Sequence, residues 1–166
     1  MIKNSNFTIR PATRRDMPAV VGIYNWAINQ TFATIDSEPL SLEEASEWWT
    51  THTDQSITTL VAEQEGDVVG WVRLLPWRQR GYEVVEDLIY VDPIYQRHGV
   101  GRRLLSEAII AAGASVCRTM VASVAVDNQT GLRLHLNLGF EVVGTIRHAA
   151  HKFDRWMDIT LLQREI

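Results

Sequence analysis

A single cysteine, Cys117, occurs among the 166 residues of this sequence, and no long hydrophobic run is present. One thiol cannot form an internal disulfide, which fits the reducing environment of the cytoplasm. The longest apolar stretch, residues 108–114, is much shorter than the roughly 18 residues that a membrane-spanning helix requires. The first six residues lack the apolar core of a signal peptide. The sequence therefore predicts a cytoplasmic protein without a membrane segment, in which Cys117 is a small buried hydrophobic residue.

Basic residues are in the minority, because 16 Lys and Arg stand against 20 Asp and Glu, for a formal net charge of −4. Nucleic-acid binding depends on basic groups that neutralise phosphates, so this balance argues against a dedicated nucleic-acid-binding protein. No Cys and His residues have the spacing of a zinc site, and no metal is expected. The composition, 46% hydrophobic and 22% charged, is that of a globular protein. Since no repeat or linker divides the chain, residues 1–166 are expected to form one domain.

Hydrophobic periodicity predicts an α+β fold with alternating groups of strands and helices. Strands are expected at about residues 7–10, 58–63, 68–75, 82–91, 120–126, 140–143 and 153–162. Helices are expected at about residues 17–28, 41–49, 100–112 and 128–139, with Asp16 as the first N-cap and a capping box at Ser41–Glu44. Consecutive hairpins favour antiparallel pairing, and strand–helix–strand units favour parallel pairing. The expected architecture is a mixed, mostly antiparallel twisted sheet of about seven strands flanked by about four helices.

The most specific local motif is a glycine-bearing turn at residues 96–102, between a predicted strand and a predicted helix. Gly99 and Gly101 allow the backbone to approach a ligand, and the free N–H groups of the first helical turn attract an anion. Arg97 and Arg102 add positive charge. The expected ligand group is a phosphate or pyrophosphate, although a Gly-x-Gly pair also occurs where it only shapes a turn. The phosphate-loop and dinucleotide-binding patterns are both incomplete here.

Three motifs in order resemble the GNAT (GCN5-related N-acetyltransferase) superfamily over essentially the whole chain. These motifs are residues 91–93 followed by 96–101, then Asn128, then residues 134–140. A narrower similarity to the phosphinothricin and methionine sulfoximine acetyltransferases is carried by residues 23–25, 76–78, 85–86, 90–91, 134–135, 152–153, 156 and 158. The resemblance implies that acetyl-CoA is the cofactor. The residues that it implies for cofactor binding are Ile89, Tyr90, Val91, Arg97, His98, Gly99, Val100, Gly101, Arg102, Asn128 and Asn137.

The resemblance also implies transfer of an acetyl group to the α-amine of a small amino acid or analogue. Such a reaction needs a general base, and Glu86 is the candidate, since its strand runs into the cofactor motif. Asp87 points to the opposite face by strand alternation and is the less favoured carboxylate. A backbone N–H near Tyr90 or Val91 is expected to face the developing oxyanion. His135 occupies the place of a tyrosine that many relatives use to protonate the leaving thiolate, and the alternative is a surface histidine that packs under the cofactor.

Recognition of an amino acid needs a cation for its carboxylate, and Arg78 and Arg80 follow the third predicted strand. Trp77 and Tyr82 are expected to line the substrate pocket together with Glu86. Asp154 stands where relatives in the narrow branch tend to have glycine, and this departure borders the predicted acceptor pocket. A protein N-terminus, a polyamine or an antibiotic are alternative acceptors, and a non-catalytic acetyl-CoA-binding module is the alternative from another class. The aromatic-rich C-terminal strands are a candidate interface for a homodimer.

Overall fold

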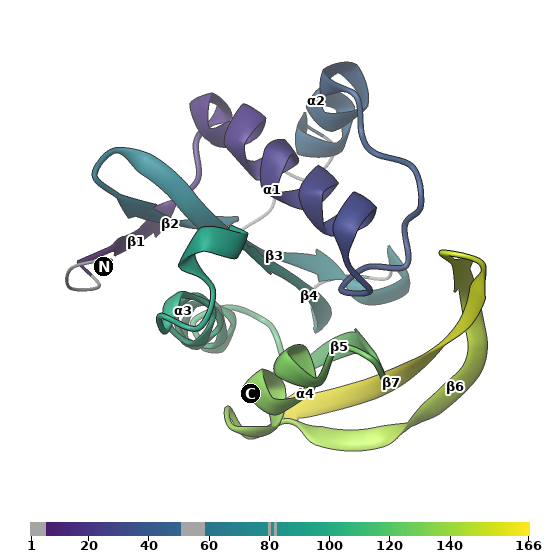
Figure 1. Ribbon diagram of the computed structural model, residues 1–166. Coiled ribbons are helices and arrows are strands. Elements are labelled where there is room, and N and C mark those ends of the chain that lie inside the picture. The colour runs from purple at the N-terminus through teal and green to yellow at the C-terminus, as the bar shows by residue number, and fades with distance from the viewer. Residues whose placement is uncertain (1–5, 51–58, 80, 82) are drawn as a thin grey trace.

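One twisted sheet of seven strands forms the centre of the computed structural model, which describes residues 6–50, 59–79, 81 and 83–166 (Figure 1). The spatial order of the strands is β1-β2-β3-β4-β5-β7-β6. β4 and β5 pair in parallel, and each of the other neighbouring pairs is antiparallel. The strands are β1 (Thr8–Pro11), β2 (Leu60–Gln64), β3 (Asp67–Pro76), β4 (Val84–Val91), β5 (Thr119–Ala125), β6 (Glu141–Lys152) and β7 (Arg155–Glu165). The predicted fold class is confirmed.

Four α-helices cover the sheet, and short 3-10 turns lie at Arg14–Asp16, Trp77–Gln79 and Pro93–Tyr95. The helices are α1 (Met17–Gln30), α2 (Leu42–Thr50), α3 (Val100–Gly113) and α4 (Gln129–Leu136). α1 and α2 lie on one side of the sheet, whereas α3 and α4 lie on the other (Figure 1). No helix in the described part of the chain is long and apolar enough to cross a membrane.

Strand alternation divides the core between the two faces. Trp71 and Tyr90 pack under α1, while Leu74 and Val85 pack under α3. Cys117 is buried in the α3 side of the core, as predicted. Because side chains alternate along β3 and β4, every residue of β4 can be assigned to one face. The even-numbered residues of β4 face α1, and the odd-numbered residues face α3.

The strand predicted at residues 140–143 is much longer than expected, since β6 extends from Glu141 to Lys152. Most of its residues are exposed, so the strand has no alternating apolar pattern that sequence analysis can detect. Pairing with β7 holds it in place, with register shifts between Val142 and Gly144 and between Ile146 and Ala150. The resulting hairpin curves away from the rest of the sheet, so that its tip comes near the loop between α1 and α2 (Figure 1).

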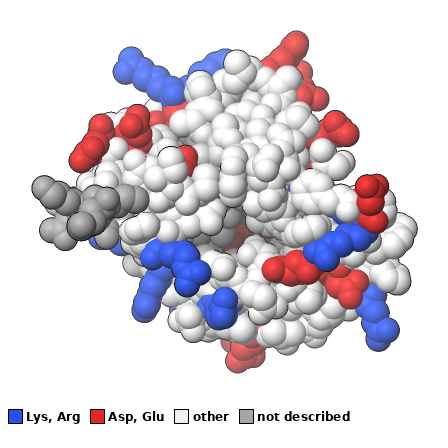
Figure 2. Space-filling model, viewed as in Figure 1, with Lys and Arg blue, Asp and Glu red and all other residues white. Residues whose placement is uncertain are grey.

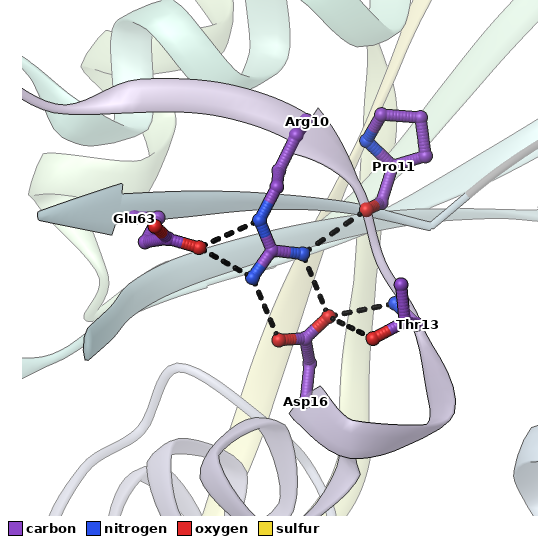
Figure 3. Close-up of polar contacts among 5 residues, drawn as sticks. All are labelled: Arg10, Pro11, Thr13, Asp16 and Glu63. Atoms are coloured by element: carbon purple, nitrogen blue, oxygen red, sulfur yellow. Dashed lines mark hydrogen bonds and ion pairs between the residues drawn. The ribbon is translucent and has the colours of Figure 1, made fainter. Parts of the chain in front are cut away.

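Asp16 occupies the N-cap position of α1, as predicted, but its side chain makes no capping hydrogen bond to the helix. Its carboxylate accepts hydrogen bonds from the N–H (2.7 Å) and the hydroxyl (3.0 Å) of Thr13, and from both terminal nitrogens of Arg10 at 2.8 Å. Arg10 Nε also donates to Glu63 Oε2 at 2.7 Å (Figure 3). Arg10 lies on β1 and forms charge-assisted hydrogen bonds with Glu63 of β2 and with Asp16 at the start of α1. It thereby joins these three segments. The hydrogen bonds with Arg10 lower the pKa of Asp16 to about 2, although its burial opposes the shift.

Candidate active site

β4 and β5 separate after a short stretch of pairing, and this separation creates the main cavity. Three positions pair, ending at Glu86 opposite Val121. Beyond them a cavity of about 790 Å³ lies along the gap, lined on one side by β4 residues 87–91 and on the other by β5 residues 122–124. In the space-filling view the molecule is hollowed near its centre, and basic side chains gather below and to the left of the hollow (Figure 2). The volume lies in the range of ligand-binding sites.

Backbone hydrogen bonds fix the direction in which the polar groups of β4 point. The Asp92 N–H donates to the Val69 C=O at 3.0 Å, toward β3. The Glu83 C=O accepts from the Arg118 N–H at 2.8 Å, toward β5. Within a strand, the backbone groups of alternate residues point to the same neighbour. Even-numbered residues of β4 are therefore bonded toward β3, and odd-numbered residues point toward β5.

The Val91 C=O accepts a hydrogen bond from Gln96 Nε2 at 3.0 Å. Past Glu86, the alternation directs the Asp87 C=O, both backbone groups of Ile89 and the Val91 N–H into the gap. These groups are suited to hydrogen-bond an extended ligand chain that takes the place of the missing strand pairing. The Tyr90 N–H points to β3 instead. Of the two residues expected to serve the oxyanion, Val91 alone has the required orientation.

The start of α3, where the sequence predicts an anion cradle, lies at one end of the cavity. Gly99 has a φ of 86°, and no protein atom lies within 4 Å of the Cβ that another residue would carry there. The first intrahelical bond runs from the Arg103 N–H to the Gly99 C=O at 3.1 Å, so the preceding N–H groups are not used by the helix. Arg97 and Arg102 both line the cavity. The cradle combines free N–H groups, a helix dipole and two guanidinium groups, which suits a pyrophosphate.

Most of the residues predicted to bind the cofactor line this cavity. They are Ile89, Tyr90, Val91, Arg97, Gly99, Gly101, Arg102, Asn128 and Asn137. Two others have different surroundings. His98 is exposed, with its Nδ1 at 2.7 Å from the Gln96 carbonyl oxygen, and the Val100 side chain packs in the core. Asn128 also caps α4, because its side-chain oxygen accepts from the Gly131 N–H at 2.9 Å.

His135 is buried at the closed end of the gap and is not a surface residue. Its Nδ1 lies 2.8 Å from the carbonyl oxygen of Gly131, and its Nε2 lies 3.0 Å from Asp87 Oδ2. Its side chain is 3% exposed and that of Asp87 1% exposed, and both residues line the cavity. Burial alone would lower the pKa of His135, but the hydrogen bond and charge of Asp87 raise it overall.

Glu86 lies on the other face of β4, on the side covered by α1 and α2. It is half-buried, and the described lining of the cavity does not include it. Its neighbour on that face is Ser123, which does line the cavity. Burial raises the pKa of Glu86, the Ser123 hydroxyl opposes the shift, and the charge of Asp87 adds to it. A carboxylate with a raised pKa is suited to accept a proton near neutral pH.

The residues predicted to bind substrate are only partly described. Arg80 and Tyr82 lie outside the described residues. Trp77 and Arg78 follow β3 but do not appear in the described cavity lining, and the Arg78 guanidinium lies 4.9 Å from the centre of the Trp77 ring. Arg78 has a φ of 52°, which is uncommon for a residue other than glycine.

Sequence analysis missed the aromatic wall that closes the cavity on the α1 side. Trp26 and Phe32 form this wall, and no motif marks them. Phe32 is held by the β6–β7 turn, because the Arg155 guanidinium lies 3.9 Å from its ring centre and the Phe153 ring lies at 5.1 Å. Arg155 also forms an ion pair with Asp127 at 3.1 Å, and Asp127 lines the opposite wall. Phe153 and Arg155 are both more than 120 positions away from Phe32 in the sequence, so local patterns could not predict these contacts.

The sequence profile of the acetyltransferase (GNAT) family matches residues 20–140. The chain belongs to this family. It is 34% identical over 161 residues to the L-methionine sulfoximine/L-methionine sulfone acetyltransferase of Salmonella typhimurium, a match that covers 96% of this chain and 94% of that protein. It is 35% identical over 162 residues to the phosphinothricin N-acetyltransferase of Streptomyces viridochromogenes, covering 95% of this chain and 86% of that protein.

A solved structure agrees with the family assignment. An acetyltransferase of Salmonella typhimurium, determined with its cofactor acetyl-CoA, superposes with a TM-score of 0.92 at 34% identity and covers 97% of this chain and 94% of that chain. GNAT proteins are N-acetyltransferases that use acetyl-CoA, and this chain is an enzyme of that class. The cavity fits such a donor, because a glycine-based helix N-terminus faces one end and the free backbone groups of β4 follow the gap.

Proposed function

We propose that this enzyme acetylates the α-amine of a small amino acid or of an analogue such as methionine sulfoximine or phosphinothricin. The observation that carries the proposal is the separation of β4 and β5 at Glu86, because the cavity then extends from the start of α3 to Ser123, the neighbour of the Glu86 carboxylate on the α1 face. Full-length similarity to the two amino-acid-analogue acetyltransferases supports this acceptor class. Acetyl-CoA supplies the activated acetyl group.

Glu86 is the proposed general base. A free amino acid is mainly an ammonium ion at neutral pH, and only its neutral amine attacks a thioester. The Glu86 carboxylate lies on the α1 face of β4, opposite the face on which Asp87 and His135 lie. The proton acceptor for the amine and the proton donor for the sulfur would therefore act from different faces of the strand. The proton that the amine loses passes to Glu86, directly or through a water molecule.

Two further groups stabilise the charge that develops as the acetyl group moves. The Val91 N–H, directed into the gap, is the proposed donor to the carbonyl oxygen of the thioester. Such a preorganised donor lowers the barrier by about 3 kcal/mol. His135 is the proposed proton donor to the departing sulfur.

Arg78 is the proposed site for the carboxylate of the acceptor. Its guanidinium is exposed and offers two parallel N–H donors, the geometry that carboxylates prefer. A cation in the acceptor site opposes polyamines and aminoglycosides, which carry several positive charges of their own. The aromatic wall of Trp26 and Phe32 provides an apolar surface for the side chain of the acceptor.

A thiol-release assay tests the proposal. Purified enzyme with acetyl-CoA is given methionine sulfoximine, phosphinothricin, the common amino acids, spermidine, an aminoglycoside and a short peptide with a free N-terminus. Acetyl transfer to the amino acids or analogues, with little to the other amines, is the expected result. If acetyl-CoA binds in a calorimetric titration but none of the amino acids or analogues releases CoA, the proposed acceptor class is wrong.

A further inference from the structure

The hydrogen bonds of His135 with Asp87 and Gly131 determine which ring nitrogens carry a proton. The Gly131 carbonyl oxygen can only accept a hydrogen bond, so His135 Nδ1 must carry a proton at this 2.8 Å contact. His135 Nε2 then faces Asp87 Oδ2 at 3.0 Å. An unprotonated Nε2 and an ionised carboxylate are both acceptors, so one further proton must lie between them.

The pair therefore holds an exchangeable proton and has no net charge in that state. This state suits its surroundings, because side chains that are 3% and 1% exposed are strongly disfavoured as isolated ions. Loss of the proton leaves a buried negative charge and two acceptors in contact, which favours its recovery. The fixed Nδ1 contact and the ring of Phe140, edge-on at 5.0 Å, hold the imidazole in one orientation.

The position of the pair connects it to the reacting end of the cavity. Asp87 is the first residue of β4 after the last position paired with β5, and both Asp87 and His135 line the cavity. Asp87 Oδ1 is buried and has no hydrogen-bond partner among the residues that the structure describes. A ligand group that can donate, such as a thiol, would satisfy this oxygen.

We propose that Asp87 keeps His135 protonated and that the pair supplies the proton shared between His135 Nε2 and Asp87 Oδ2 to the sulfur of CoA, an inference that rests on the proposed function. When the amine nitrogen bonds to the acetyl carbon, the carbon–sulfur bond breaks and its electron pair remains on sulfur. The sulfur takes the proton that His135 Nε2 and Asp87 Oδ2 share, which leaves the pair with one negative charge. The amine gives its proton to Glu86 or water, and the pair recovers a proton from water, so the products are an amide and a free thiol.

The charges around His135 are consistent with this role. On β4 it faces Asp87, and Glu86 points away on the other face of the strand. On its own helix the ionisable neighbour that lines the cavity is Arg133, which is exposed, and the packed neighbour Phe140 carries no charge. Asp87 is thus the charged group in direct contact, and its removal is expected to return His135 to a neutral imidazole.

Nitrogen-15 NMR of the histidine side chains tests the proton directly, without any acceptor. The His135 signals are assigned by their loss in His135→Gln. At pH 7.5 to 8, both ring nitrogens of His135 should be protonated. In Asp87→Asn, His135 should carry a proton at Nδ1 only. A wild-type His135 without a proton on Nε2 at pH 7 overturns the proposal.

The kinetic test separates proton delivery from structure. Asp87→Asn, which has nearly the same shape, should lower kcat by about 10²-fold with an unchanged KM for acetyl-CoA, and Asp87→Glu should restore part of the loss. His135→Gln should lower kcat about as much as the double variant Asp87→Asn/His135→Gln does, because the two residues act as one unit. Asp67→Asn, an exposed aspartate in the β2–β3 turn, is the matched control. An unchanged kcat in Asp87→Asn, or additive losses, contradicts the proposal.

The two proposals fail in different ways. If no amine accepts the acetyl group, the proposed function fails, and the NMR measurement still decides whether Asp87 keeps His135 protonated. If transfer is fast in Asp87→Asn, the proposed function stands and the role of the pair is wrong.

Discussion

Glu86 and Asp87 are consecutive residues whose side chains lie on opposite faces of β4, at the position where β4 and β5 separate. One carboxylate is therefore on the side of α1 and the other on the side of α4. A reaction that removes a proton from a nitrogen and supplies one to a sulfur needs a basic and an acidic group on different sides of the same carbonyl carbon. β4 places the proposed base Glu86 on one face and Asp87, the partner of the proposed acid His135, on the other, because alternation separates adjacent side chains.

Replacement of Glu86 by Gln should lower turnover by roughly 10²-fold or more and leave acetyl-CoA affinity nearly unchanged. A general base acts when it is ionised, so wild-type activity should rise with pH through the pKa of Glu86, which burial raises. This rise should disappear in Glu86→Gln. The measurements are kcat/KM between pH 5 and 9 and calorimetric titration with acetyl-CoA. Glu83→Gln, at an exposed position three residues earlier, is the control, and an unchanged pH profile in Glu86→Gln removes Glu86 from the mechanism.

Several elements of the fold could be predicted because their signals are local. Ser41 and Glu44 form the expected capping box, with the Ser41 N–H donating to Glu44 Oε2 at 2.8 Å. Gly66, with a φ of 94°, forms the expected turn between β2 and β3. The position of the anion cradle also follows from a short motif, since glycine and free helical N–H groups act over a few residues.

The partner of Asp87 could not be predicted, because it is 48 positions away and lies on α4. Strand alternation correctly placed the Asp87 side chain on the other face of β4 from Glu86. It gave no information about which residues of other elements lie against that face. The strand from Glu141 to Lys152 was underestimated for a related reason. An exposed edge strand is stabilised by pairing with its neighbour, so its own sequence carries little apolar pattern.

The cradle predicts a specific loss of cofactor affinity. A Cβ at Gly101 would lie 3.5 Å from a Leu134 side-chain carbon, an ordinary contact, so Gly101→Val should fold normally. Its branched side chain should hinder approach of the pyrophosphate and weaken acetyl-CoA binding at least about 10-fold in calorimetric titration. Gly99→Val should have the same effect and also lower the melting temperature, because its φ of 86° disfavours branched residues.

Gly22→Ala is the matched control for these glycine variants. Gly22 lies within α1, and no atom is within 4 Å of an added Cβ. Alanine there should stabilise the protein by about 0.5–1 kcal/mol and leave acetyl-CoA affinity unchanged. Equal affinity in Gly101→Val and wild type would contradict a pyrophosphate site at the start of α3.

The Arg10–Asp16 pair predicts an acid-sensitive contribution to stability. The pKa of Asp16 falls from 3.8 to about 2 on folding, so its ionised form is favoured in the native state. This contribution is complete above about pH 5 and is lost as the pH falls through 4 to 2. Asp16→Asn should destabilise the protein by about 1–3 kcal/mol at pH 7 in urea unfolding, and by less at pH 3. Glu38→Gln is an exposed control, and an Asp16→Asn effect that is independent of pH would contradict the ion pair as its source.

Phe32 should influence binding of the acceptor amine and not binding of the donor acetyl-CoA. Its ring lies between Arg155 and Phe153 and forms part of the cavity wall on the α1 side, away from the cradle on α3. Phe32→Ala removes this wall, so the KM for the amine should rise roughly 10-fold, while the KM for acetyl-CoA should stay within about twofold. Ile35→Ala, which is half exposed on the same loop, should change neither value. A parallel rise in both KM values would instead place Phe32 in the donor half of the cavity, because loss of an acceptor contact alone leaves binding of acetyl-CoA intact.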